Sequence, residues 1–381
     1  MIEPKESVKN TPPAYHGAFD YDELARLGYS PDEVTDFSVN SNPYGAPKSV
    51  REAIASVPLD RYPDRECIAL REKLAEHHHT NIENIVVGNG TAELLMLIAQ
   101  AFIREGDKVL VVEPAFSEYQ RVSELMGADI EVFLTDIAVG ASLDWSEIEK
   151  LEIAVEVIQP RIVFFSNPNN PSGQGYFNRF LLKIIQKNPQ TLFVSDEAYI
   201  NFILSHSMMS ELYPFISSPN RDERLRVVGI QTVKNVLSLR SLTKDYAIAG
   251  LRLGYVIGYP DIVEPIRRVR PAWNVNGLAQ ASGIAVLDEF IWMRKTIAQL
   301  HQDKDDLVGS LQDLGLSSLD SLVHYFLVNV GDATAFRSKL LQHKIMVRDC
   351  TSFGLPQYIR IATRTPEDNA KLLQAIEVIQ S

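Results

Sequence analysis

The sequence predicts an α/β protein with a large domain on a mostly parallel sheet and a smaller α/β domain at the C-terminal end. Short, continuously apolar runs such as KVLVVE (108–113) and RIVFFS (161–166) alternate with stretches of helical periodicity. This alternation is typical of parallel strands covered by helices on both faces. The pattern changes after RPAWNVN (270–276), where a long charged helical region begins. With 381 residues, the chain has room for roughly two or three domain-sized units.

Three segments are expected along the chain. Residues 1–48 are rich in Pro, Asn and Ser and are typical of an extended arm with turns. Residues 49–270 carry the alternation of strands and helices and form the predicted large domain. Residues 271–381 form the predicted small C-terminal domain.

The elements of the large domain are predicted from their local patterns. Leu94, Leu95 and Ile98 recur at helical spacing, and Gly106 suits the end of that helix. In chain order we expect a strand at 84–89, a helix at 91–103, a strand at 108–113, a helical stretch ending at residue 127, and strands at 161–166, 191–196, 226–231 and 253–258.

The elements of the small domain follow in the same way. In chain order we expect a helix at about 288–314, a strand at 324–330, a helix near 333–342, strands at 344–349 and 358–363, and a terminal helix.

Composition limits the class of function. The formal net charge is -12, and no basic stripe of the kind a nucleic-acid binder carries is visible. Cys67 and Cys350 are far apart, so neither a zinc site nor a disulfide is expected. No apolar run approaches the roughly 20 residues of a membrane helix, and the N-terminus lacks the apolar core of a signal peptide. We expect a cytoplasmic protein that acts on a small molecule.

Ligands of α/β sheets bind beyond the carboxyl ends of the strands, so the residues that follow each expected strand are candidate site residues. Gly90, Thr91 and Ala92 follow strand 84–89 and open a helix that could receive a phosphate, although alone they fit a plain tight turn better. Phe116 follows strand 108–113 and either stacks on a flat ring or packs in the core. Asn170 lies in an amide-rich turn after strand 161–166.

Asp196 ends the apolar strand 191–196, with Tyr199 shortly after it. A carboxylate in this position is costly unless a cation faces it. Asp196 is therefore expected to meet a bound cation, and a protonated pyridine nitrogen would serve. The alternative, to which we give equal weight, is that Asp196 is an ordinary surface carboxylate at the end of the strand.

The segment from Ser241 to Tyr255 is the most informative. Lys244 is followed by small and apolar residues, where burial would lower its pKa and yield a nucleophilic amine. Ser241, Thr243 and Arg252 surround it with groups that bind phosphate. A solvated loop lysine would not explain this spacing.

These motifs resemble those of the fold-type-I pyridoxal 5′-phosphate (PLP) enzymes in the class I/II aminotransferase family. The pattern S-x-x-K is followed by A-G-L-R-x-G, and P-N-N-P-[ST]-G and D-E-A-Y are also present. The resemblance extends from about residue 16 to the C-terminus. It implies a PLP-dependent transferase fold, an amino-acid substrate and a homodimer.

The resemblance also implies a role for each matched residue. Lys244 would hold the cofactor as a Schiff base and move the substrate proton, and Asp196 would pair with the pyridinium nitrogen. Asn170 and Tyr199 would hydrogen-bond the ring hydroxyl oxygen. The other residues implied in cofactor binding are Phe116 over the ring, Gly90, Thr91, Ala92, Ser241, Thr243 and Arg252 around the phosphate, and Tyr62 reaching the phosphate across the dimer interface.

Two groups within the family are most similar: threonine-phosphate decarboxylase of cobalamin biosynthesis and histidinol-phosphate aminotransferase. His16-Gly17, Thr243 directly before the lysine and the run containing Asn42 favour the decarboxylase. The chain departs from the decarboxylase motif H-G-G-N, because Ala18 and Phe19 follow Gly17. We therefore expect decarboxylation of a phosphorylated amino acid, with transamination as the alternative.

The resemblance also points to the residues that would bind the substrate. Arg348 and Arg360 match arginines that meet its anionic groups, with His16 and Asn42 beside them. Pairing of Arg348 with Asp349 is the structural alternative.

Other functions were weighed. Residues 77–79 are all histidine, but consecutive helical side chains point about 100° apart and do not converge on one metal ion. Gly88 and Gly90 lack the third glycine of a nicotinamide-binding loop. A non-catalytic protein that binds PLP or an amino acid stays open, and Lys244 and Asp196 argue against it.

Overall fold

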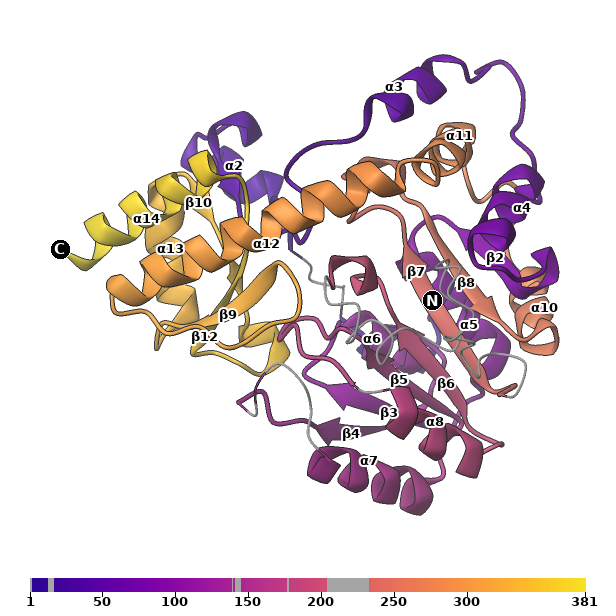
Figure 1. The fold of residues 1–381 in the computed structure, drawn as a ribbon. Coiled ribbons are helices and arrows are strands. Elements are labelled where there is room, and N and C mark those ends of the chain that lie inside the picture. Colours follow the sequence, from indigo (N-terminus) through magenta and orange to yellow (C-terminus); the bar gives the residue numbers. More distant parts are fainter. Residues whose placement is uncertain (1, 13–16, 139, 141–144, 177, 204–232) are drawn as a thin grey trace.

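A seven-stranded sheet forms the centre of the molecule (Figure 1). The computed structural model describes the chain except residues 1, 13–16, 139, 141–144, 177 and 204–232. In spatial order the strands are β2 (Ile85–Gly88), β8 (Gly254–Gly258), β7 (Val236–Ser241), β6 (Leu192–Asp196), β5 (Ile162–Ser166), β3 (Lys108–Glu113) and β4 (Asp129–Leu134). Strand β8 is antiparallel to both neighbours, and the pairs from β7 to β4 are all parallel. The predicted class, α/β with a mostly parallel sheet, is confirmed.

Helices cover both faces of this sheet. On one face, Leu94, Val122 and Val263 join a single buried apolar cluster with the strands. They come from α5 (Thr91–Phe102), α6 (Glu118–Leu125) and α10 (Pro260–Val269). On the other face, Ile148 and Ile184 pack on the sheet, and they come from α7 (Trp145–Ile158) and α8 (Asn178–Lys187). The strands are therefore buried on both sides, which explains their continuously apolar sequences.

Smaller sheets lie to one side of the central sheet, on the left in Figure 1. Strands β11 (Arg348–Asp349), β12 (Tyr358–Ala362) and β9 (Tyr325–Asn329) form an antiparallel sheet, and β1 (Thr35–Asp36) pairs with β10 (Ile345–Met346). The helices packed with them are α2 (Tyr21–Leu27), α13 (Ala333–Gln342) and α14 (Pro366–Gln380). Helix α12 (Phe290–Asp313) runs from these sheets towards α11 (Gly277–Val286), α3 (Lys48–Ala55) and α4 (Ile68–His77) (Figure 1).

Several predicted elements need correction. The N-terminal segment is not simply extended, because it contains α1 (Glu6–Asn10), α2 and β1. The single strand expected at 344–349 is two short strands, β10 and β11, which pair in different sheets. Strands β4 and β7 were not predicted, since β4 is a largely exposed edge strand with two acidic residues and β7 carries buried polar side chains. The strand expected at 226–231 lies outside the described residues.

The remaining predicted helices and strands match the structure within a few residues. The division of the chain into three segments stays a prediction. Helix α11, which falls in the predicted small domain, packs against α3 and α4 of the predicted large one. Short 3-10 turns occur at Pro31–Glu33, Ile82–Asn84, Ile200–Phe202, Ala249–Leu251 and Thr351–Phe353. In the part of the chain that the structure describes, no helix is both long and apolar enough to cross a membrane.

A buried ion pair joins the ends of the two strands that carry the central site residues. Arg240 Nε on β7 lies 2.7 Å from Glu197 Oε2, directly after β6. Both side chains are almost completely buried, and Ser195 Oγ donates to Glu197 Oε1 at 3.0 Å. The pair thereby fixes the two strand ends relative to each other.

Replacing Arg240 by methionine should lower the free energy of unfolding by about 3–5 kcal/mol, because the Glu197 carboxylate would remain buried without its cation. The exposed pair Arg268–Glu264 provides the control, where Arg268→Met should change stability by less than about 1 kcal/mol. Urea denaturation of both variants measures the difference. Equal losses in the two would contradict the structural role of the buried pair.

Candidate functional site

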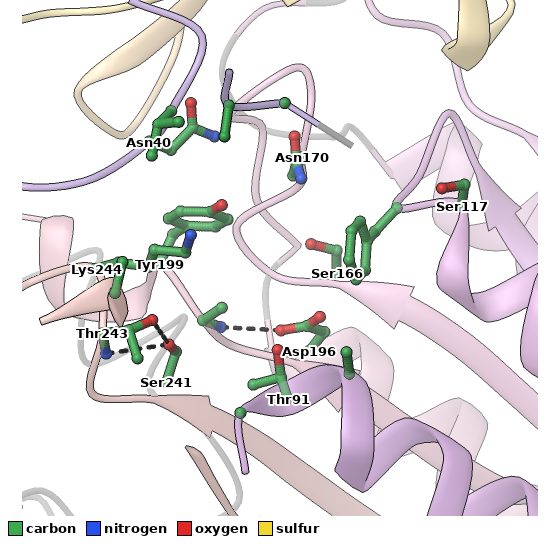
Figure 2. A pocket seen from close by; sticks show the side chains of 18 of the residues that line it. Asn40, Thr91, Ser117, Ser166, Asn170, Asp196, Tyr199, Ser241, Thr243 and Lys244 are labelled. Carbon is green, nitrogen blue, oxygen red and sulfur yellow. Dashed lines mark hydrogen bonds between the residues drawn. The ribbon is translucent and has the colours of Figure 1, made fainter. Parts of the chain in front are cut away.

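One cavity of about 340 Å³ opens at the carboxyl ends of the central parallel strands. Most of the residues selected from the sequence line it. They are Gly90, Thr91, Ala92, Phe116, Asn170, Asp196, Tyr199, Ser241, Thr243, Lys244, Arg252, Arg348 and Arg360. Figure 2 shows Lys244 beside Tyr199, with Asn40 and Asn170 on one side of the cavity and Thr91, Ser241 and Thr243 on the other.

Lys244 lies in the loop after β7 and is partly buried. Its pKa is lowered to about 8, mainly by burial and further by the positive charges of Arg252 and Arg360. A substantial fraction of the amine is therefore neutral near pH 8, whereas an ordinary lysine would be fully charged. The cavity thus contains a nucleophilic amine.

Asp196 is buried, with 6% of its surface exposed. Tyr119 donates its hydroxyl proton to Oδ2 at 2.8 Å, and the backbone N–H of Ala198 donates to Oδ1 at 3.1 Å. Burial nevertheless raises the pKa of Asp196 to about 6. Among the described residues, no lysine, arginine or histidine forms an ion pair with it. A cationic ligand would stabilise the carboxylate.

The opposite end of the cavity suits an anion. Gly90 precedes α5 with φ of 82°, and a Cβ built there would lie 2.8 Å from Nη2 of Arg252. Glycine therefore leaves room between the helix N-terminus and the guanidinium. The hydroxyl groups of Ser241 and Thr243 lie 2.8 Å apart in the same region (Figure 2). Helix N–H groups, hydroxyls and an arginine together form a binding site for a phosphate.

Two buried arginines enter the cavity from adjacent strands, because Arg348 on β11 and Arg360 on β12 are register partners. Arg360 donates to the Asn170 side chain and, at 2.7 Å, to the backbone carbonyl of Ser38. Arg348 donates to Ser352 Oγ at 2.8 Å, and its guanidinium lies 5.2 Å from the centre of the Phe353 ring. Both arginines face the cavity with positive charge.

Two of the selected residues that the structure describes do not line the cavity. Tyr62 is 78% exposed and stacks on Trp273 with ring centroids 4.8 Å apart, so it contributes nothing to the cavity of its own chain. Asn42 does not line the cavity, because its side chain is hydrogen-bonded to the loop that carries Lys244, and its expected contact with the substrate stays a prediction. His16 lies outside the described residues.

The structure also adds lining residues that were not selected from the sequence: Gly17, Ala18, Ser38, Val39, Asn40, Ser117, Tyr119, Ser166, Ala198, Ala249 and Phe353. Tyr119 is the most informative of them. It lies one helical turn after Phe116, and its ring stacks on Phe164 at 5.6 Å. That spacing was the signal available in the sequence, but only the fold reveals that the hydroxyl meets Asp196.

The described residues contain no group of three or more His, Cys, Asp or Glu side chains that could hold a metal ion. Of the consecutive histidines, His78 is buried and its Nε2 lies 2.8 Å from the Tyr255 hydroxyl. Three consecutive histidines at the end of a helix would by themselves suggest a solvated helix end, but the ring of His78 packs against Tyr255 of β8.

The donor set fits PLP. The phosphate group matches the anion site at Gly90, Thr91, Ser241 and Arg252, the ring nitrogen would supply the cation that Asp196 lacks, and the aldehyde matches the amine of Lys244. Phosphate site, carboxylate and amine all belong to the same cavity.

Known proteins show the same architecture. The family model for aminotransferase class I and II matches residues 32–376. The chain is 32% identical over 349 residues to the histidinol-phosphate aminotransferase of Symbiobacterium thermophilum, covering 91% of this chain and 90% of the relative. It is 31% identical over 346 residues to a protein of Caldanaerobacter subterraneus provisionally named as a threonine-phosphate decarboxylase, covering 88% of each.

A solved structure agrees in fold. The histidinol-phosphate aminotransferase of Sinorhizobium meliloti, crystallised in complex with pyridoxal-5′-phosphate, superimposes with a TM-score of 0.83 at 21% identity, covering 100% of this chain and 99% of the other. The match of the family model over nearly the whole length establishes the relationship. The chain belongs to the class I and II aminotransferase family.

Proposed function

We propose that this chain is a PLP-dependent aminotransferase that acts on a phosphorylated amino compound, of the histidinol-phosphate aminotransferase type. The observation that carries the proposal is the placement of Lys244 and the buried carboxylate of Asp196 in one cavity with two buried arginines. A non-catalytic binding protein would not need an amine whose pKa is lowered to about 8.

Different residues around the cavity would bind different parts of the cofactor. When bound, PLP serves as an electron sink for the bonds at the substrate Cα. Asp196 would hold the ring nitrogen in its protonated form, while Tyr199 and Asn170 would hydrogen-bond the ring oxygen. Phe116 would cover the ring. The residues that would hold the phosphate are Gly90, Thr91, Ala92, Ser241, Thr243 and Arg252, which line the same cavity.

Lys244 attaches the cofactor and later moves the substrate proton. A base is most effective when its pKa lies near the working pH. Burial and the neighbouring arginine charges bring the pKa of Lys244 into that range. The same amine can therefore accept a proton at Cα and return it.

Arg348 and Arg360 bind the anionic groups of the substrates. Each is buried yet lines the cavity, so a phosphate or carboxylate there meets a desolvated guanidinium capable of bidentate hydrogen bonds. A substrate with a phosphate group fits this pair of arginines. A second substrate with two carboxylates, such as glutamate, fits it as well.

The choice between transamination and decarboxylation changes relative to the sequence-based expectation, which favoured threonine-phosphate decarboxylase. Relatives named histidinol-phosphate aminotransferase at 32%, 32% and 31% identity support the alternative. Threonine in place of serine at position 243 distinguishes the two groups of enzymes only weakly. The Thr243 hydroxyl contacts the Ser241 hydroxyl, and a serine hydroxyl could make the same contact. The decarboxylase stays a second candidate because of the relative at 31% identity.

The expected homodimer and cytoplasmic location stay predictions. Tyr62 supports the dimer, because it projects an exposed aromatic ring outside its own cavity. In the proposed assembly this ring reaches the phosphate site of the partner subunit.

Incubation with PLP followed by borohydride reduction should place the pyridoxyl group on Lys244. The rate of attachment should rise with pH and level off above about pH 8, because only the neutral amine reacts and the pKa of Lys244 is lowered to about 8. Peptide mass spectrometry reads the labelled site, and the exposed Lys234 beside Tyr259 is the internal control. Label on Lys234 alone would overturn the assignment.

Histidinol phosphate with 2-oxoglutarate should yield glutamate, detected by a coupled assay. Histidinol without the phosphate should react about 10- to 100-fold less efficiently, because it forfeits charge-assisted hydrogen bonds to the arginines. O-phospho-L-threonine without any acceptor is the parallel assay for carbon dioxide. Faster release of carbon dioxide than formation of glutamate would assign the chain to the decarboxylase instead.

A further inference from the structure

Asn42 lies beneath the loop that carries Lys244, with 3% of its surface exposed. Its backbone N–H donates to the carbonyl oxygen of Lys244 at 2.8 Å. Its side-chain Nδ2 donates to the carbonyl oxygen of Asp245 at 2.9 Å and to Thr296 Oγ1 at 2.8 Å. All three N–H bonds of Asn42 therefore have acceptors, and two of these acceptors are consecutive carbonyls of the lysine loop.

The side chain of Asn42 is itself fixed. Its Oδ1 accepts from the backbone N–H of Tyr44 at 3.1 Å, so the amide cannot turn over without losing bonds at both ends. Thr296 belongs to α12, where its hydroxyl donates to the carbonyl of Met293 at 3.0 Å. Met293 lies in the same buried apolar cluster as Tyr246 of the lysine loop. The loop is thus tied to a long, well-packed helix through one asparagine.

This arrangement controls the direction of the lysine side chain. The peptide planes that contain the Thr243 and Lys244 carbonyls meet at Cα of Lys244, and fixing both fixes its Cα–Cβ direction. The Ile248 backbone N–H donates to the Thr243 carbonyl at 3.1 Å and the Asn42 backbone N–H to the Lys244 carbonyl, while the Asn42 side chain holds the next plane through the Asp245 carbonyl. Asn201 holds the loop from another side by donating to the Asp245 carboxylate at 2.6 Å. A lysine Nζ at the end of a long side chain moves appreciably when its backbone tilts, and reactive groups misplaced by about 1 Å lose about 100-fold in rate.

We propose that Asn42 is a positioning residue for Lys244, which acts through the lysine loop and contacts neither substrate nor cofactor. The inference rests on the proposed function only in taking Lys244 as the reactive amine. It replaces the sequence-based role of Asn42 as a substrate ligand. It also explains why an asparagine about 200 residues away in sequence is buried against this loop.

Asn42→Leu tests the proposal, since leucine has similar volume and removes both Nδ2 donors. Asn84→Leu is the matched control, because Asn84 is also buried and its Nδ2 donates to a backbone carbonyl, that of Gly258, at 2.8 Å. Strand β8 begins at Gly254, which lies next to Thr91 of the cavity. Gly258 is at the other end of the strand, away from the cavity. Melting temperatures of both variants report the loss of stability.

The readouts are the rate at which the cofactor-free protein attaches PLP, the pH midpoint of the absorbance band of the bound cofactor, and kcat and KM for the amino donor. Asn42→Leu should slow attachment and lower kcat by about 10- to 100-fold, move the pH midpoint, and leave KM within about twofold. Asn84→Leu should leave attachment and the midpoint at the wild-type values. A rise in KM at unchanged kcat would instead make Asn42 a substrate ligand, and equal effects of the two variants would reduce it to a stabilising residue.

Thr296→Val is a milder variant in case Asn42→Leu does not fold, because it removes one acceptor of the Asn42 amide and keeps the shape of the side chain. It should slow attachment several-fold, and a wild-type rate would overturn the proposal. Failure of the proposed function is distinguishable, because borohydride would then leave Lys244 of the wild-type protein unlabelled. With Lys244 labelled in the wild type and no change in either variant, only the positioning role fails.

Discussion

The buried carboxylate of Asp196 is the constraint on which the rest of the site depends. A charged group at the end of an apolar strand is costly unless a cation faces it, and the hydrogen bonds from Tyr119 and Ala198 offset that cost only in part, because the pKa of Asp196 still rises to about 6. The sheet buries the carboxylate, and the stacked ring of Tyr119 holds its donor in place. The described residues offer it hydrogen bonds and no salt bridge. A ligand with a cationic ring would supply the missing positive charge.

Around this one anion the cavity gathers positive charge, although the chain as a whole carries a net charge of -12. Lys244, Arg252, Arg348 and Arg360 all line it. Burial, together with the charges of Arg252 and Arg360, lowers the pKa of Lys244. The arginines would at the same time provide separate places for the phosphate of the cofactor and the anionic groups of a substrate. The same electrostatic arrangement therefore binds the ligands and prepares the amine. The ion pair between Glu197 and Arg240 keeps together the ends of β6, which carries Asp196, and β7, which leads into the Lys244 loop.

The sequence predicts the site well where a local pattern carries the chemistry. Lys244 and Arg252 stand in one short motif, and Asp196 ends an apolar strand, so residue type and position were sufficient. The position of Asn42 outside the cavity could not be predicted, because an amide that faces a ligand and an amide that faces a loop about 200 residues away look identical in sequence. The division of 344–349 into β10 and β11 and the polar strand β7 escaped prediction, because long-range pairing, and not local periodicity, defines them.

The most direct test of this account is the titration of Asp196 followed by carbon-13 NMR of its carboxyl group, assigned with Asp196→Asn. In the cofactor-free protein the carboxyl should titrate near pH 6, since burial raises its pKa to about 6. With PLP bound, the pKa should fall well below that value, because a protonated ring nitrogen favours the carboxylate. An unchanged titration after PLP is bound would show that Asp196 does not pair with the ring and would contradict the account.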